Sequence, residues 1–148
     1  MRLFCYVLAV SLIGVSCARA QDTRHVTEPR IPSACVVLKA HLAAVDGVLP
    51  AEAEQALDTD RIQQAMDRCA PGKAVELRAD SGKQVFLSGP LTLRSGVTLV
   101  IDADTSLAAS ANPRLYDITP GSCGVLGEHG QGCKPLLSGH DIDRKSVV

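Results

Sequence analysis

The spacing of hydrophobic residues changes partway along the chain, from a helical period to an alternating one. Asp60 stands before the helical segment and Gln63 follows it by three residues, so the pattern predicts Asp60 as the N-cap and Gln63 as its capping-box partner. Pro71 and Gly72 predict the end of this helix. Its predicted apolar face carries residues spaced i, i+3, i+4 and i+7, namely Ile62, Ala65, Met66 and Cys69.

After the predicted helix, apolar and polar residues alternate in short runs, which indicates strands with one buried face. Polar turns such as 80–82 and 94–96 separate the runs, and the unit of strand, turn and strand recurs about every 20 to 25 residues. Such units bury their apolar faces by stacking on one another, so the pattern predicts a β solenoid. The residues expected to face its core are Val75, Leu77, Leu91, Leu93, Val97, Leu99 and Ile101.

The segments before the helix are less regular. Residues 35–40 predict a first strand, whereas 45–54, with Gly47 and Pro50, match neither a helical nor a strand period. Residues 21–34 are polar and contain two prolines, which predicts an extended arm.

The first 20 residues match a secretory signal peptide. Arg2 precedes an apolar run over 3–15, and a small-residue cleavage site lies before Gln21. The apolar run is shorter than the ~20 residues of a membrane-spanning helix. Cys17 lacks the large aliphatic residue three positions upstream that lipidation would favour. We therefore expect a secreted protein, extracellular or periplasmic, that is not attached to a membrane after cleavage.

The amino-acid composition limits the classes of ligand that the chain is expected to bind. The net charge of the 148 residues is −1, which does not favour nucleic-acid binding. Aromatic residues make up 3% of the chain and tryptophan is absent, so the core must be aliphatic and the aromatic platforms on which sugars stack must lie elsewhere.

Four cysteines remain after removal of the predicted leader: Cys35, Cys69, Cys123 and Cys133. In an oxidising compartment an even number predicts disulfides, and four cysteines allow three connectivities. We favour Cys123 with Cys133, which closes a short Gly-rich loop, and Cys35 with Cys69, which ties the first strand to the end of the helix. A zinc site is the alternative, but the chain has no CxxC pair.

Three segments together resemble the start of the family 28 glycoside hydrolases, the polygalacturonases and their relatives. They are 58–69 (DTDRIQQAMDRC), 85–93 (VFLSGPLTL) and 95–99 (SGVTL). Residues 121–137 are also similar to the disulfide loop of bacterial polygalacturonases, and the resemblance extends over 35–142. It implies an all-β fold, the first coils of a right-handed parallel β-helix, in which an N-terminal α-helix caps the open end of the first coil.

The resemblance also implies an activity. The parent protein would hydrolyse α-1,4-galacturonosyl bonds in pectin by inversion, without a cofactor and as a monomer. The family's catalytic motifs, Asn-Thr-Asp, Asp-Asp, Gly-His-Gly and Arg-Ile-Lys, do not occur in this sequence. We therefore assign no catalytic residue and no metal ligand, and expect an inactive N-terminal fragment of the enzyme.

Several aspartate and histidine residues could be mistaken for catalytic groups. Asp102 and Asp104 flank a predicted turn, where aspartate commonly bonds its own backbone. The string 127–130 (GEHG) nearly spells the family's Gly-His-Gly but has an inserted Glu, and 139–141 (GHD) does not match it either, so we interpret both as surface loops. His25 and His41 receive no role. 

The last residues, 143–148, depart from the pattern. The DNA sequence GATCGGAAGAGCGTCGTG, part of a common sequencing-library adapter, encodes the same string, so we interpret 143–148 as a non-native tail; a genuine basic C-terminus is the alternative. A non-catalytic β-helix, either an adhesin or a carbohydrate-binding solenoid, is the alternative function. A pectate lyase would need clustered carboxylates for Ca²⁺, which this stretch does not show.

Overall fold

The structure of the protein is a computed structural model that describes residues 30–125 and 132–141. The predicted signal peptide, most of the predicted arm and the tail 143–148 lie outside the described residues. In chain order the elements are β1 (Ala34–Lys39), η1 (Ala51–Gln55), α1 (Thr59–Arg68), β2 (Lys73–Arg78), β3 (Val85–Ser88), β4 (Leu91–Leu93), β5 (Val97–Ile101), β6 (Ser106–Ala109), η2 (Pro113–Tyr116) and β7 (Leu137–Gly139). No helix within these ranges is long and apolar enough to cross a bilayer.

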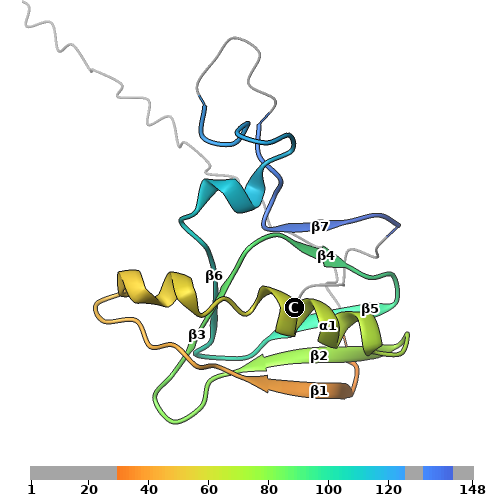
Figure 1. Cartoon of the computed structure of the whole chain (residues 1–148). Coiled ribbons are helices and arrows are strands. Elements are labelled where there is room, and N and C mark those ends of the chain that lie inside the picture. The colour runs from red at the N-terminus through yellow and green to blue at the C-terminus, as the bar shows by residue number, and fades with distance from the viewer. Residues whose placement is uncertain (1–29, 126–131, 142–148) are drawn as a thin grey trace, which may run out of the picture.

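Strands of successive coils pair in parallel and form three sheets (Figure 1). One sheet has the order β1-β2-β5, a second pairs β3 with β6, and the third pairs β4 with β7. Lys73 lies opposite Val97 and Val85 opposite Ser106, so each strand of one coil meets its counterpart in the next. This is the pairing of a parallel β-helix, as the sequence predicts.

The first coil consists of β2, β3 and β4, and the second of β5, β6 and β7. The two coils differ in the connection that precedes their last strand. In the first coil two residues join β3 to β4, whereas in the second coil residues 110–136 lie between β6 and β7. We call residues 110–136 the clipped insertion. Its described part carries η2 and projects away from the stacked strands in Figure 1. The β4–β7 pair therefore forms only after the chain has passed through the clipped insertion.

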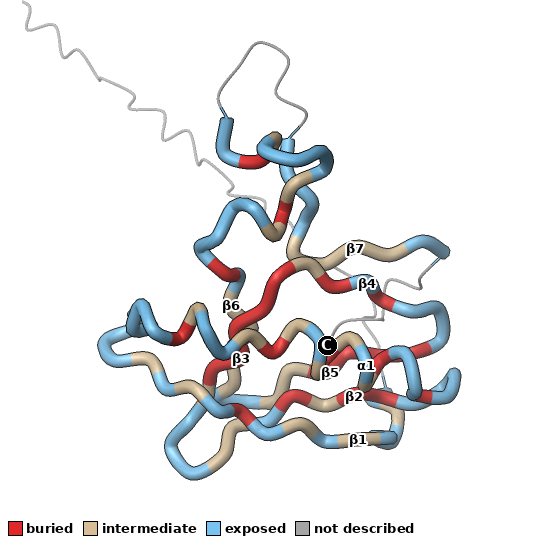
Figure 2. The backbone as a smooth tube through the Cα atoms, in the orientation of Figure 1, coloured by how far each residue is buried: buried red, intermediate tan, exposed pale blue. Residues whose placement is uncertain are grey.

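The core lies between the three sheets and α1 (Figure 2). The alternating residues predicted to face it are buried, except Ile101, which is only partly buried. All four residues of β3 are buried, which alternation does not predict, because covering both faces of a strand needs neighbours far away in sequence. The fully buried side chains of largest volume include Phe86, Ile62 and Met66.

The prediction that Asp60 caps the helix is wrong. Helix α1 begins at Thr59, Asp58 occupies the N-cap position, and no side chain makes a cap hydrogen bond. Gln63 does not complete a capping box; its Oε1 accepts from Thr92 N at 2.9 Å and its Nε2 donates to Thr92 O at 3.1 Å. The amide of Gln63 is therefore used by the backbone of β4, a partner that local spacing does not reveal.

The segment without a predicted period contains a tight turn and a 3-10 helix. Val45 and Val48 exchange backbone hydrogen bonds of 3.0 and 2.9 Å around the turn, and both side chains are exposed. In η1, Glu54 accepts hydrogen bonds from Ser110 Oγ and from Ala111 N, the latter at 2.7 Å. This carboxylate joins η1 to the start of the clipped insertion.

Candidate functional site

The turn aspartates do not form a catalytic pair. Asp102 Oδ1 accepts from Ala103 N at 2.9 Å, and Asp102 Oδ2 accepts from Arg78 Nε at 3.1 Å. Asp104 lies in the same turn, which Thr105 N closes by donating to Asp102 O, and has a φ of 60°. The Asp102 carboxylate is thus bonded to its own turn and to the neighbouring coil, in agreement with its interpretation as a turn residue.

The histidines take different positions. His41 Nε2 lies 3.4 Å from Arg61 Nη1, a neighbour that the sequence did not indicate. His140 follows β7 directly and is exposed, and Asp141 has a φ of 52°. His25 and the string 127–130 lie outside the described residues.

A partly buried ion pair at the start of α1 was missed by the sequence analysis. Arg61 donates to Asp58 Oδ1 from Nε at 3.0 Å and from Nη2 at 2.5 Å, and Asp58 is 4% exposed. Arg61 Nη1 donates to Lys39 O at 2.9 Å, and its guanidinium carbon lies 5.2 Å from the centre of the Phe86 ring. The spacing Asp-x-x-Arg was visible in the sequence, but nothing local indicated that the pair would be buried.

Arg61 also borders a groove between β1 and α1, which we call the helix–strand groove. It has a volume of about 340 Å³, and the Cys35–Cys69 disulfide forms part of its wall. The other residues that line it are the apolar Val36, Leu38 and Ala65 and the polar Arg61, Gln64 and Arg68. Within the described part of the chain it is a hollow in which cationic side chains border an apolar floor.

The two favoured disulfides are present in the structure. Cys35 is bonded to Cys69 with a Cα–Cα distance of 5.9 Å, and Cys123 to Cys133 with one of 4.8 Å. The first joins β1 to the C-terminal end of α1, and the second closes a loop within the clipped insertion. Among the described residues no three His, Cys, Asp or Glu side chains are grouped as metal ligands.

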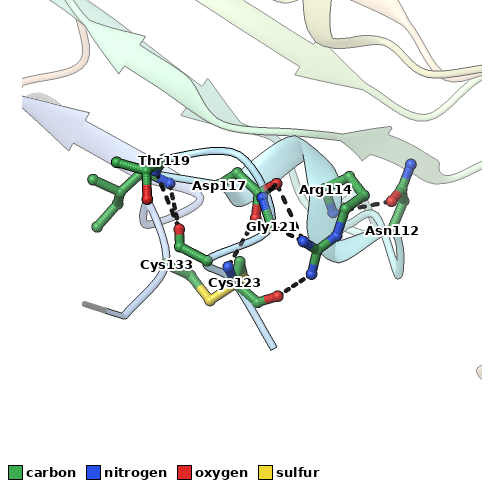
Figure 3. The surroundings of a disulfide bond; sticks show 9 residues. Asn112, Arg114, Asp117, Thr119, Gly121, Cys123 and Cys133 are labelled. Carbon is green, nitrogen blue, oxygen red and sulfur yellow. Dashed lines mark hydrogen bonds and ion pairs between the residues drawn. A yellow bond between two sulfur atoms is a disulfide. The ribbon is translucent and has the colours of Figure 1, made fainter. Parts of the chain in front are cut away.

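The carboxylate of Asp117 organises the described part of the clipped insertion (Figure 3). It accepts from Gly121 N at 2.7 Å and from Cys123 N at 2.8 Å, and Arg114 Nη1 lies 3.3 Å from it. Arg114 also donates to Cys123 O. Tyr116 anchors the insertion to the first coil, because its hydroxyl donates to Ser88 O at 3.0 Å. The carboxylate thus holds the turn 117–123, which leads to the first cysteine of the disulfide.

These contacts predict an acid-sensitive loop. The backbone N–H groups of Cys123 and then Gly121 lower the pKa of Asp117. A carboxyl whose pKa is depressed in the folded state stabilises at pH values above the unfolded pKa of about 3.9, and this stabilisation is lost as the pH falls through the folded pKa. Amide exchange at Gly121 and Cys123, corrected for intrinsic rates, should therefore accelerate below about pH 4.

Asp117→Asn tests the assignment, because the amide cannot ionise. In this variant protection of the two amides should be lower at neutral pH and should change little on acidification. Asp104→Asn is the matched control, since Asp104 lies in a turn outside the insertion. An unaltered pH profile in Asp117→Asn would mean that another group causes the acid sensitivity.

Comparison with known proteins finds similarity to bacterial polygalacturonases. The chain is 41% identical over 133 residues to an endo-polygalacturonase of Pectobacterium carotovorum subsp. carotovorum. It is 38% identical over 132 residues to a polygalacturonase of Ralstonia solanacearum. These matches include 88% and 83% of this chain, but only 30% and 25% of the relatives.

The structural comparison agrees. The solved structure of a polygalacturonase from Erwinia carotovora ssp. carotovora aligns with a TM-score of 0.64 and 39% sequence identity. The alignment covers 80% of this chain and 28% of that structure. No protein-family model matches the chain. The chain thus spans less than a third of the length of the relatives it matches.

Proposed function

Starting from the homology of this chain to bacterial polygalacturonases, we propose that it is the first part of a secreted glycoside hydrolase. The complete protein would hydrolyse α-1,4-galacturonosyl bonds of pectin with inversion of configuration. The observation that carries the proposal is the identity of 41% over 133 residues to an endo-polygalacturonase. The parallel pairing of successive coils supports the proposal, because it is the strand arrangement of a parallel β-helix.

Helix α1 has the role of an N-terminal cap in this proposal. Ile62 and Met66 from α1 are 0% and 1% exposed and belong to the core cluster, and the helix contacts β2 and β4. The core of a solenoid is otherwise open at its first coil, where apolar side chains and unpaired strand edges would meet water. The apolar face of α1 covers this end.

The opposite end of the stack needs further coils. Ile101, Leu107 and Leu137 come from the three strands of the second coil, and each is only partly buried. A following coil would cover these side chains and pair with their strands. Inverting catalysis requires an acid and a base held about 6.5 to 9.5 Å apart. We assign both carboxylates to the later coils, because the sequence contains none of the family's catalytic motifs.

The test of this function is hydrolysis by the complete protein. We expect it to release reducing ends from polygalacturonate, and proton NMR of the first product should show the inverted anomer. Residues 21–142 alone should release none. If the complete protein retains polygalacturonate but does not cleave it, the non-catalytic solenoid replaces the enzyme as the function.

Residues 21–142 expressed alone should also fold poorly. The last coil leaves backbone groups unpaired, and so few coils give too little interface to offset a backbone ordering cost of about 1 to 2 kcal/mol per residue. We expect a broad thermal transition and aggregation. The matched control is the complete protein, which should unfold cooperatively. A sharp and reversible transition of monomeric 21–142 would contradict the proposal that this stretch depends on further coils.

A further inference from the structure

We propose that the helix–strand groove is a binding site for a single uronate unit, with the uronate carboxylate at Arg68. The choice of ligand rests on the proposed function, because pectin supplies galacturonate, whereas the site itself is argued from the described residues of β1 and α1. It would give the protein a contact with pectin at the N-terminal end of the solenoid.

The size and lining of the groove fit one sugar ring. Its volume of about 340 Å³ lies within the usual range of small-molecule sites, about 300 to 1,000 Å³. Val36, Leu38 and Ala65 provide an apolar floor on which the C–H face of a pyranose can pack. The Cys35–Cys69 disulfide holds β1 and the end of α1 together, so two sides of the groove are connected covalently.

The charge of the groove favours an anion. Arg61 is paired with the buried Asp58 and bonded to Lys39 O, so its guanidinium is held in place and its charge is balanced. Arg68 lies on the same side of α1, one turn beyond Gln64, and is exposed at the groove. A guanidinium binds a carboxylate through two parallel hydrogen bonds. None of the described residues that line the groove is acidic.

Two other hollows among the described residues contain acidic as well as basic side chains. The hollow beside the start of α1 places Asp60 together with Lys134. The hollow between the stacked turns places Asp80 and Asp104 together with Lys83. A carboxylate ligand would meet a like charge in both, which disfavours binding. Of these three hollows, only the helix–strand groove has no acidic side chain in its lining, so it suits an anion best.

The groove also offers hydrogen-bonding groups for sugar hydroxyls. The amide of Gln64 lines it from α1 and supplies a donor group and an acceptor. A uronate has one carboxylate, several hydroxyls and an apolar face, which matches this set of groups.

Arginine footprinting of the complete protein tests the proposal without a variant. Arg68 is exposed and should react with phenylglyoxal, and digalacturonate at about twice its dissociation constant should slow that reaction about threefold. Arg94, which is exposed and donates to Asp67 O, is the reference arginine within the same molecule. Neutral galactobiose is the control ligand and should protect neither residue, because it lacks the carboxylate.

A matched pair of variants adds a second readout. Arg68→Ala should reduce retention of the complete protein on immobilised polygalacturonate, whereas Arg94→Ala should not. Cleavage of short soluble oligogalacturonides should be unchanged in Arg94→Ala. Equal modification of Arg68 with and without digalacturonate, or equal protection by galactobiose, would overturn the proposal. Protection of Arg68 in a protein that does not cleave polygalacturonate would support the groove and reject the hydrolase.

Discussion

Replacing Phe86 by alanine should lower the free energy of unfolding of the complete protein by about 3 to 5 kcal/mol. The Phe86 side chain is fully buried in the core between the sheets and α1, and its ring lies beneath the guanidinium of Arg61. Its removal forfeits the burial of a large apolar surface and leaves a cavity that the surrounding core fills only in part. The ring's contact with Arg61 is lost as well.

Urea unfolding of the complete protein measures this effect, and two variants serve as controls. Phe86→Leu retains most of the volume and should cost less than about 1.5 kcal/mol. Val37→Ala removes an apolar side chain that is 40% exposed on β1, and its effect should be smaller than that of Phe86→Ala. Equal losses in Val37→Ala and Phe86→Ala would mean that β3 does not lie at the centre of the core.

The second large effect is expected for Asp58→Ala, which should lower the free energy of unfolding by about 2 to 3 kcal/mol. Removing one member of a buried pair costs about 3 to 5 kcal/mol, and the expected value is lower because the Arg61 side chain remains 29% exposed to water. Without Asp58 the guanidinium keeps its bond to Lys39 O but loses its counter-charge. The start of α1 would then be held less firmly against β1 and β3.

Asp60→Ala is the control that separates structure from sequence pattern. The local spacing predicts that Asp60 caps the helix, in which case its removal would cost about 1 kcal/mol. The structure places Asp60 exposed in the first turn, so we expect at most about 0.5 kcal/mol. Urea unfolding of both variants decides between them, and a larger loss for Asp60→Ala than for Asp58→Ala would restore the original prediction.

The candidate groups were only partly visible in the sequence. Cys35, Cys69, Cys123 and Cys133 were recognised because an even set of cysteines after a predicted signal peptide indicates disulfides. The roles of Asp58 and Arg68 were not recognised. Leu87, whose carbonyl accepts from Asp58 N, and the β1 residues that line the groove with Arg68 lie 29 or more residues away along the chain. Charge and spacing alone cannot show that a side chain is buried or borders a groove.

The sequence by itself determined the succession of one amphipathic helix and short alternating strands, because helical and strand periods are local properties of neighbouring residues. Repeated apolar strands of similar spacing also determined that coils must stack, since no single coil buries its own apolar face. Only the tertiary structure decided where α1 begins, that Gln63 binds the backbone at Thr92, and that both faces of β3 are covered. Those outcomes depend on contacts between residues distant in the chain, whose geometry exists only after the coils have stacked.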